Sequence, residues 1–327
     1  MTKLVTIFGG AGFVGRYIAR RMAKEGWRVR VAGRRPNESM HVKPYGAPGQ
    51  VEPVFCNIRD DDSVRAVMQG ADAVVNCVGI SDERGKQSFE AVQSEGAARI
   101  ARIASDMGVA RLVHLSAIGA DLESTSKYLV SKAEGEAAIL ESFHDATILR
   151  PSVIFGTEDG FFNKIAGLSR FTPVMPVFSG DTRFQPVYVD DVAKAAVVAI
   201  IGGAAPGVYE LGGSDVLTFR EIMEKALKVS YRKRILVGLP MFVGHVMAGA
   251  LSLVETLSLG AVPNFLMTRD QLRAMGDDNV VGDDVKTLAD FGVEPVRLDT
   301  VLPEYLWRYR PSGQYDDIRD SAANLRG

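Results

Sequence analysis

Several features that would point to other classes of protein are scarce in this chain. Its 327 residues include two cysteines and four histidines, none at the spacing of a zinc site, so we expect no bound metal. The formal net charge of −2 gives no basic excess of the kind that nucleic-acid-binding domains carry. No apolar run reaches the roughly 20 residues of a membrane-spanning helix, and the chain begins without a secretion signal. We therefore expect a globular protein on the cytosolic side, with Cys56 and Cys77 as buried, reduced thiols.

Short apolar segments and longer amphipathic ones alternate through the first half of the chain. Strands are predicted over residues 4–8, 28–32, 51–56, 72–79, 111–116 and 146–149, with helices over 13–25, 62–68, 89–107 and 127–141 between them. Strands separated by helices of this length are typical of a parallel sheet. The sequence therefore predicts an α/β fold: a Rossmann-type doubly wound parallel sheet with a smaller C-terminal lobe.

The alternation loosens after Pro151. A helix over residues 190–201 and a strand over 208–211 are predicted to return to the sheet, and polar residues dominate from about Pro311. We predict a domain that holds most of the sheet at residues 1–155, a mixed region with the returning elements and a small apolar lobe at 156–310, and a polar tail at 311–327.

The first predicted strand is followed at once by a glycine-rich turn and a helix. Gly9 permits a tight turn, Gly12 lets a pyrophosphate approach the backbone, and Gly15 lets helix and strand pack closely. The start of the helix offers free N–H groups and the positive end of its dipole to the phosphates. Glycines can also serve a tight turn alone, but the strand before and the helix after favour a dinucleotide site. The predicted phosphate-binding residues are Gly9, Gly12, Phe13, Val14, Gly15 and Arg16.

The end of the second strand indicates which dinucleotide is bound. NAD-binding sites carry an acidic residue there for the ribose hydroxyls, whereas this chain has Arg34 and Arg35. A guanidinium suits a 2′-phosphate through its charge and its forked donors, and Arg16 could reach the same group. Both loop arginines could instead be solvated charges. The pattern favours NADP(H) over NAD(H), so residues 1–155 are predicted to be an NADP(H)-binding domain.

Ligands of doubly wound sheets lie beyond the carboxyl ends of the strands, and this rule predicts further cofactor contacts. The predicted residues follow three strands: Asn57 and Ile58 flank the adenine, Val78, Gly79 and Ile80 pass under the riboses, and Pro151, Ser152 and Val153 follow the sixth strand.

Tyr128 and Lys132 stand four positions apart, on one face of the predicted helix over residues 127–141. A tyrosine can exchange a proton with a carbonyl or an alcohol, and a lysine beside it lowers its pKa from about 10 and holds the ribose. Ser116 would orient the substrate oxygen. These three residues are the predicted catalytic set, although the same pair could hold the nicotinamide ribose without turnover.

Together these segments resemble the atypical extended short-chain dehydrogenases/reductases. The resemblance rests on the glycine loop and on residues 72–79, 128–132, 150–156 and 185–193. Residues 126–136, 155–159, 161–163, 184–189 and 267–271 are more narrowly similar to the NADPH-binding accessory subunits of respiratory complex I, the NADH:ubiquinone oxidoreductase. The similarity extends to about Pro311, and the start without a presequence suggests a bacterial member.

This resemblance implies a tightly held NADPH with no established turnover. It also implies a peripheral protein that contacts other complex I subunits and, in a bacterium, lies on the cytoplasmic face of the inner membrane. Two departures from extended reductases weigh against turnover: Gln93 stands where they commonly have asparagine, and the segment from Ser116 to Tyr128 is shorter. The alternative is a free NADP-dependent reductase, epimerase or dehydratase of the extended class.

One apolar stretch, residues 235–265, follows a basic cluster at residues 231–234. A pair of core helices in a small substrate lobe would explain the stretch. It contains more apolar residues than one helix face can bury, however, and basic residues beside an apolar helix suit an anionic membrane surface. We therefore predict peripheral contact of this lobe with a membrane or with membrane subunits.

Overall fold

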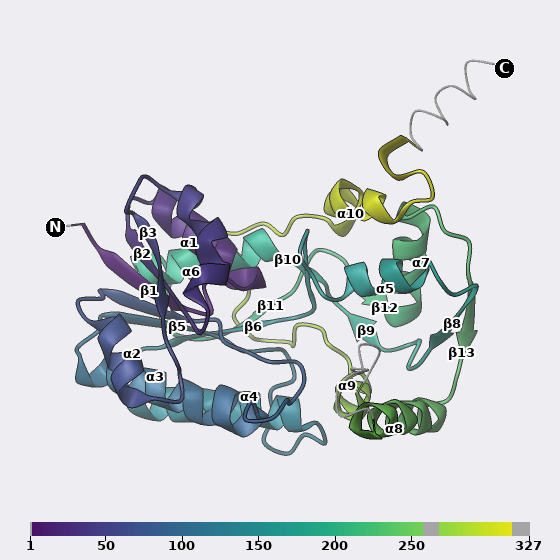
Figure 1. The fold of residues 1–327 in the computed structure, drawn as a ribbon, viewed down its shortest axis with the longest axis horizontal. Helices are drawn as coiled ribbons and strands as arrows, with labels where there is room; N and C mark the ends of the chain where they lie inside the picture. The colour runs from purple at the N-terminus through teal and green to yellow at the C-terminus, as the bar shows by residue number, and fades with distance from the viewer. Residues whose placement is uncertain (1, 258–267, 316–327) are drawn as a thin grey trace. The chain divides into compact units, whose positions relative to one another are not determined.

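A seven-stranded parallel sheet forms the centre of the N-terminal part of the chain (Figure 1). The structure is a computed structural model that describes residues 2–257 and 268–315. The strands are β1 (Leu4–Phe8), β2 (Arg28–Gly33), β3 (Val51–Phe55), β4 (Ala73–Asn76), β5 (Arg111–Leu115), β6 (Thr147–Pro151) and β11 (Gly207–Leu211). They lie in the order β11-β6-β5-β4-β1-β2-β3, so the order reverses between β1 and β4 and creates a topological switch point there. The predicted fold class is confirmed.

The chain divides into two units, each made of several segments. The first comprises Met1–Ser152, Val189–Gly212 and Val281–Pro295, and the second comprises Val153–Tyr188, Gly213–Val280 and Val296–Gly327. The predicted helix and strand that return to the sheet are α6 (Val189–Ile201) and β11, which pairs with β6. Predictions for residues 258–267, in the apolar stretch, and 316–327, in the polar tail, lie outside the described residues.

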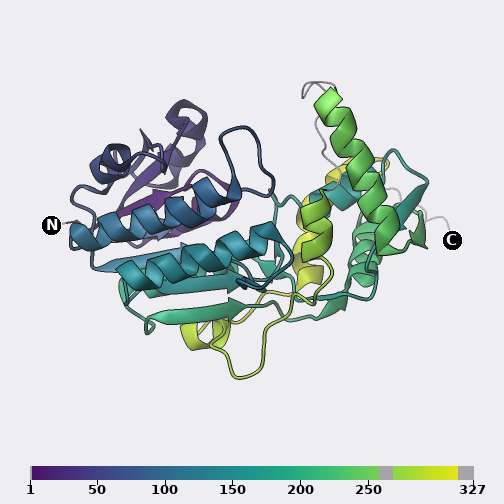
Figure 2. The same ribbon diagram turned by 90° about the horizontal axis from the view of Figure 1, so that it is seen from below.

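Helices cover both faces of the sheet (Figure 1), and Figure 2 shows the face that α3 (Glu95–Asp106) and α4 (Lys127–Ser142) cover. On one face lie α1 (Phe13–Lys24) and α6, and on the other lie α2 (Asp61–Met68), α3 and α4. Alanines and isoleucines of α3 pack with Phe8, Val74 and Ile148 of the strands. Arg21 of α1 donates to both carboxylate oxygens of Asp190 of α6, at 2.7 and 2.5 Å. The strands are therefore covered on both sides, as their uninterrupted apolar runs require.

Two predicted elements are shorter by several residues than the sequence pattern indicates, because the regular strand or α-helix is interrupted at the carboxyl edge of the sheet. The strand predicted over residues 72–79 ends at Asn76. The helix predicted over 89–107 begins with a π-helical turn, Glu90–Ser94, ahead of α3. Cys56 and Cys77 each lie one residue beyond a strand, and both are free thiols. Cys56 is buried as predicted, whereas Cys77 is half-buried because it stands in the loop that leaves the sheet.

The second unit is organised around aromatic side chains. Phe155, Phe162, Phe184, Phe219 and Tyr305 are buried in one cluster. Its elements are β7 (Ile154–Phe155), α5 (Phe162–Leu168), β8 (Val174–Val177), β9 (Arg183–Phe184), β10 (Val187–Tyr188), β12 (Leu217–Thr218), α7 (Phe219–Val229), β13 (Ile235–Gly238), α8 (Met241–Leu257), α9 (Arg269–Ala274), α10 (Leu298–Leu306) and the short turns η4 (Trp307–Tyr309) and η5 (Gly313–Tyr315). The first unit also contains the short helices η1 (Pro36–Tyr45) and η3 (Leu288–Phe291).

The described part of the predicted apolar stretch forms β13 and α8. Ala248 packs with Phe178 and Leu272, so one side of α8 is buried as in a core helix. Phe242 and Val246, one helical turn apart, are 68% and 67% exposed. Within residues 2–257 and 268–315, no helix has both the length and the apolar character needed to cross a bilayer.

Candidate functional site

The glycine loop joins β1 to α1 at the switch point of the sheet. Gly9 has a left-handed φ of 72°, and a Cβ there would lie 3.1 Å from the carbonyl carbon of Cys77, just past β4. A Cβ on Gly15 would lie 2.4 Å from the Gly9 carbonyl oxygen, closer than any side chain tolerates. The Gly9 N–H donates to the Ala32 carbonyl of β2 at 3.0 Å. The loop is therefore held against the ends of three neighbouring strands, and only glycine fits at Gly15.

The first turn of α1 presents N–H groups at the same edge. Gly12 is its N-cap residue, and no described side chain caps the turn. The first N–H groups of a helix have no carbonyl partner within the helix, and together with the helix dipole they favour a bound anion. The Arg16 guanidinium donates to the carbonyls of Gly12 and Ala11 at 3.2 and 3.1 Å, so in this structure Arg16 braces the loop.

Arg34 and Arg35 follow β2, where the adenosine ribose is recognised in this fold. Both side chains are exposed. Arg35 forms an ion pair with Glu38 at 3.2 Å. Arg34 has no hydrogen bond or ion pair to any residue in the described ranges 2–257 and 268–315. Of the two predicted arginines, Arg34 is the one whose donors are not already engaged.

Asn57 and Ile58 shape the loop after β3. The Asn57 N–H donates to Ser63 Oγ at 2.9 Å, and its side-chain oxygen accepts from the Arg59 N–H at 3.2 Å. Ile58 is half-buried, and its Cδ1 would lie 2.9 Å from a Cβ on Gly96. These contacts build the loop at the edge of the sheet where the adenine is predicted to bind.

The loop after β4 lies beside two buried side chains from other segments. A Cβ on Gly79 would lie 3.5 Å from Lys132 Nζ and 3.4 Å from Gln93 Oε1. The Ile80 N–H donates to the same Oε1 at 3.4 Å. Residues 78–80 and Lys132, predicted separately from two stretches of sequence, are thus brought together.

Lys132 and Tyr128 lie in the first turns of α4. Lys132 is 4% exposed, its Nζ donates to the Leu115 carbonyl at 3.0 Å, and it lies 6.0 Å from the centre of the Tyr128 ring. Burial lowers the pKa of Lys132 to about 8 and raises the pKa of Tyr128 to about 12. The prediction that Lys132 lowers the pKa of Tyr128 is therefore wrong for the protein by itself, because desolvation dominates. At neutral pH Lys132 is a cation and Tyr128 a neutral phenol.

Two buried polar side chains at β5 have no hydrogen-bond partner in the described part of the chain. They are Ser116, through Oγ, and His114, through both ring nitrogens. Burial, with a smaller effect of Lys132, lowers the pKa of His114 well below its ordinary value, so its ring is neutral. A buried, unsatisfied hydroxyl costs about 1–3 kcal/mol. A ligand atom bonded to Ser116 would remove that cost, which fits the predicted contact of Ser116 with a substrate oxygen.

Gln93 is a functional candidate that the sequence marked only as a departure from a family pattern. It is 1% exposed, and its Nε2 donates to Ser131 Oγ at 2.8 Å while its Oε1 accepts from Ile80. It lies in the π-helical turn, and Gly135 lets that turn approach α4, since a Cβ there would lie 2.3 Å from the Gln93 carbonyl oxygen. Turns of this kind are frequent at functional sites. Because residues 89–107 follow a regular helical pattern, the sequence alone does not indicate this π-helical turn.

The three predicted residues after the sixth strand fall in two different units, because the boundary between the units lies between Ser152 and Val153. The Pro151 carbonyl accepts from the Ile118 N–H at 3.0 Å, and the Ser152 N–H donates to the Leu211 carbonyl at 2.9 Å. Both residues thus join neighbouring strand ends of the first unit. Val153 belongs to the second unit and packs with its aromatic cluster.

These residues of the first unit fit an adenine dinucleotide. The glycine loop and the start of α1 form a cradle that a Cβ would fill, and no residue in the described part of the chain bonds to the Arg34 guanidinium or to the buried Ser116 Oγ. The described residues contain no group of three or more His, Cys, Asp or Glu side chains that could hold a metal ion.

Comparisons with known families and proteins agree with this geometry. A family model described as "NAD dependent epimerase/dehydratase family" matches residues 5–212. The chain is 34% identical over 316 residues to "NADH dehydrogenase [ubiquinone] 1 alpha subcomplex subunit 9, mitochondrial" of Arabidopsis thaliana, covering 95% of this chain and 79% of the relative. It is 33% identical over 250 residues to "Ceramide reductase" of Caulobacter vibrioides, covering 76% of this chain and 77% of the relative.

A solved structure shows the same fold. The UDP-glucose 4-epimerase of Thermus thermophilus, in complex with NAD, matches with a TM-score of 0.65 and 18% identity, covering 94% of this chain and 99% of that one. The low identity limits this likeness to the fold.

Proposed function

The chain belongs to the NAD dependent epimerase/dehydratase family, and from this premise we propose that it is an accessory subunit of complex I that binds NADPH and supports assembly or stability near the membrane. The observation that carries the proposal is the similarity to alpha subcomplex subunit 9, which spans 95% of the chain. The family match ends at residue 212, so the similarity to the subunit continues through most of the second unit as well.

NADPH is proposed over NADH because of the charge at the end of β2. Arg34 offers forked donors that are not engaged by described residues, and the two positions directly after β2 are Arg34 and Arg35, where NAD-binding sites carry an acidic residue. Hydrogen bonds to charged groups contribute about 1.5–3 kcal/mol each. One such contact with a 2′-phosphate corresponds to roughly ten- to hundredfold discrimination.

Retention of the nucleotide explains the opposite end of the site better than oxidation of an alcohol does. The pKa of Tyr128, raised to about 12, keeps the phenol protonated at neutral pH, so it is a poor base for removing the proton of an alcohol. A nucleotide present at about a thousandfold excess over its dissociation constant stabilises a fold by about 4 kcal/mol. That is close to the whole stability margin of many domains. We therefore propose a structural role for the bound NADPH.

The second unit carries the surface that we propose for contact with the membrane or with membrane subunits. Phe242 and Val246 project from α8, and Lys233 is exposed. The other basic residues of the cluster are partly engaged: Arg232 Nε donates to the Tyr309 carbonyl at 3.0 Å, and Arg234 Nε donates to the Ser169 carbonyl at 2.7 Å. Apolar and basic side chains together favour an anionic membrane surface, and we propose that this is the cytoplasmic face of a bacterial inner membrane.

Purification from native membranes in a mild detergent tests the proposal. The co-purifying chains and the nucleotide released on denaturation are identified by mass spectrometry. We expect complex I subunits and NADP(H). Isolation of the chain without any complex I subunit, under conditions that keep the complex intact, would contradict the proposal. An Arg34→Ala variant that lost its nucleotide yet assembled normally would contradict the structural role of NADPH.

A free NADP-dependent reductase, epimerase or dehydratase is the second candidate. The similarity to a ceramide reductase favours it, as does the presence of Ser116, Tyr128 and Lys132. Bound NADPH would then supply a hydride, while Tyr128 would donate the proton to the product oxygen and Lys132 would hold the ribose. The isolated protein should then oxidise NADPH with a carbonyl substrate, and Tyr128→Phe should abolish the activity. An accessory subunit should show no such consumption in either form.

A further inference from the structure

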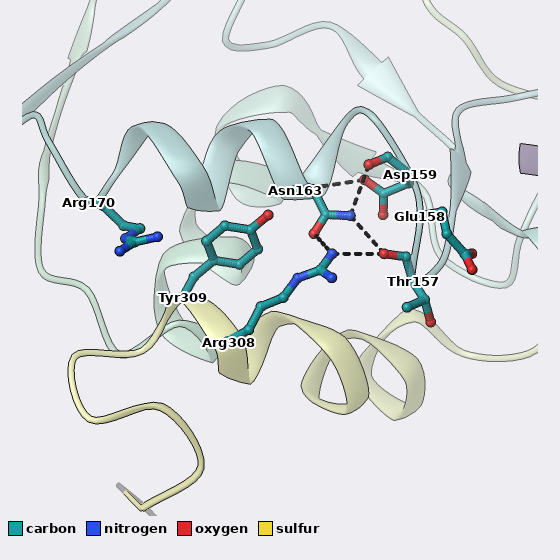
Figure 3. A pocket seen from close by; sticks show the side chains of 7 residues that line it. All are labelled: Thr157, Glu158, Asp159, Asn163, Arg170, Arg308 and Tyr309. Atoms are coloured by element: carbon teal, nitrogen blue, oxygen red, sulfur yellow. Dashed lines mark hydrogen bonds between the residues drawn. The ribbon is translucent and has the colours of Figure 1, made fainter. Parts of the chain in front are cut away.

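The second unit contains a cavity of about 520 Å³ beside α5 and η4 (Figure 3). Arg308 lines it and is held in a defined position, since its Nη2 donates to the Thr157 carbonyl at 2.8 Å and to Asn163 Oδ1 at 2.5 Å. Asn163 is anchored in turn through Nδ2, which donates to the Asp159 carbonyl at 2.9 Å. Among the described residues, partners engage one nitrogen of the Arg308 guanidinium, so its other donors are available to the cavity.

Two further donors line the same cavity. The Arg170 guanidinium lies 5.7 Å from the centre of the Phe171 ring and forms no hydrogen bond or ion pair within residues 2–257 and 268–315. The Tyr309 hydroxyl also forms none with the described residues. The cavity thus gathers the Arg170 guanidinium, the remaining donors of Arg308 and the Tyr309 hydroxyl, none of which is hydrogen-bonded to a described side chain or carbonyl.

The acidic residues of the cavity do not neutralise this side of it. The buried Asp159 carboxylate faces inward, where it accepts from the Tyr305 hydroxyl and from the N–H groups of Gly156 and Phe161. Figure 3 shows Glu158 on the far side of Asn163 from Tyr309 and Arg170. The Arg170 side is therefore suited to an anion.

The chain beside Arg170 is apolar and basic. Phe171, the next residue, is 81% exposed. Val174 of β8 and Ile235 of β13 pair in register and are 46% and 65% exposed. Arg234, just before Ile235, is joined to the Ser169 carbonyl and so lies close to Arg170. Exposed aromatic and aliphatic side chains mixed with arginines are typical of the boundary between water and lipid.

We propose that this cavity binds a phosphate group, and that the phosphate belongs to the headgroup of an anionic phospholipid. Arg170 and Arg308 supply forked donors for the phosphate oxygens, and Tyr309 supplies a hydroxyl donor. The choice of a lipid rests on the proposed membrane contact. The phosphate site itself depends neither on the nucleotide nor on complex I.

Vesicle flotation of the purified full chain tests the inference. Vesicles of phosphatidylcholine, with and without phosphatidylglycerol, are compared for the wild type, Arg170→Gln, Arg170→Lys and the control Arg273→Gln. Arg273 is an exposed arginine of α9 that does not line the cavity. We expect Arg170→Gln to weaken binding to the anionic vesicles by about tenfold, more than the roughly fivefold effect of one basic residue near such a surface. Arg170→Lys should lose less binding to the anionic vesicles, because lysine keeps the positive charge but lacks the forked donors of the guanidinium.

A second arm separates lipid from free phosphate. Inorganic phosphate is titrated against the wild type and Arg170→Gln while the melting temperature is measured. If phosphate stabilises only the wild type while both proteins float equally, the cavity binds free phosphate and the lipid source is wrong. Equal loss of flotation in Arg170→Gln and Arg273→Gln, without a phosphate effect, overturns the cavity as a site. These measurements use the purified chain without complex I. A negative result therefore contradicts the lipid site and not the proposed role in complex I, which co-purification tests.

Discussion

The two ends of the proposed cofactor site are formed by different parts of the chain: backbone at one end and buried polar side chains at the other. At the glycine loop, the site is made by backbone and by the absence of side chains, as the 2.4 Å approach of a Gly15 Cβ to the Gly9 oxygen shows. At the other end, it is made by buried polar side chains, since Lys132, Gln93 and Ser116 are each at most 4% exposed. The first kind of site depends on shape, and the second depends on protonation and on hydrogen bonds that span segments distant in sequence.

This difference separates binding from chemistry. A backbone cradle binds phosphates whatever the rest of the site does, because its donors are always present. Buried polar groups do chemistry only if their pKa values suit it, and burial shifts the pKa of Tyr128 upward, away from the range of a base. Four changes, from the largest expected effect to the smallest, test this contrast.

Gly15→Ala should have the largest effect. Its Cβ would meet backbone atoms at 2.4 and 2.6 Å, which cannot be relieved by turning a side chain. We expect a loss of about 3 kcal/mol in the free energy of unfolding, the upper end for overpacking, and no measurable nucleotide binding. Urea denaturation and a nucleotide titration measure these. Gly160→Ala is the control, because a Cβ there meets nothing within 4 Å and should leave both quantities unchanged.

Lys132→Met should change how stability depends on pH. In the fold the pKa of Lys132 is lowered from 10.5 to about 8, so between these values the unfolded chain binds more protons than the folded one. Stability linked to this group is therefore complete above pH 10.5 and lost as the pH falls through 8. As the pH rises from 8 to 10.5, the free energy of unfolding of the wild type should increase by up to about 3 kcal/mol relative to that of Lys132→Met. Urea unfolding across the window checks this, with the exposed Lys24→Met as control; parallel curves for wild type and Lys132→Met would contradict it.

Arg34→Ala should weaken NADPH binding by roughly tenfold or more, about 1.5–3 kcal/mol, and leave NADH binding nearly unchanged. Arg35→Ala is the matched control, because Arg35 already pairs with Glu38. Isothermal titration calorimetry with NADPH and with NADH gives, for each variant, the ratio of its dissociation constant to that of the wild type. An equal effect of the two substitutions would show that general charge, and not Arg34, selects the cofactor.

Gln93→Asn should have the smallest effect. The shorter side chain cannot reach both Ile80 and Ser131, so one hydrogen bond is lost at a cost of about 1 kcal/mol. We expect nucleotide to dissociate several times faster and the melting temperature of the nucleotide-free protein to fall by about 2 °C. Stopped-flow displacement measures the rate, and Gln69→Asn on the surface is the control. An unchanged rate would limit Gln93 to a packing role.

Much of the first unit could be predicted because its signals are local. The apolar runs that form β1, β2 and β4 and the spacing of Gly9, Gly12 and Gly15 are read within single segments. The ends of elements were harder to predict, since the π-helical turn at Glu90–Ser94 and the loop after Asn76 arise where segments meet. The cavity of the second unit could not be predicted from the sequence, because Asn163 and Arg308 are far apart along the chain and come into contact only in the folded protein.

The sequence by itself therefore determined the α/β class, the glycine loop and the arginines after β2, because each follows from residue type and spacing within one stretch of chain. Only the tertiary structure decided the state of the other end of the site. The pKa values of Tyr128 and Lys132, the burial of Ser116 away from any described hydrogen-bond partner, and the bridge made by Gln93 depend on which groups exclude water and which come within hydrogen-bond reach. Desolvation and pairing are properties of packed neighbours, and no spacing along the chain specifies them.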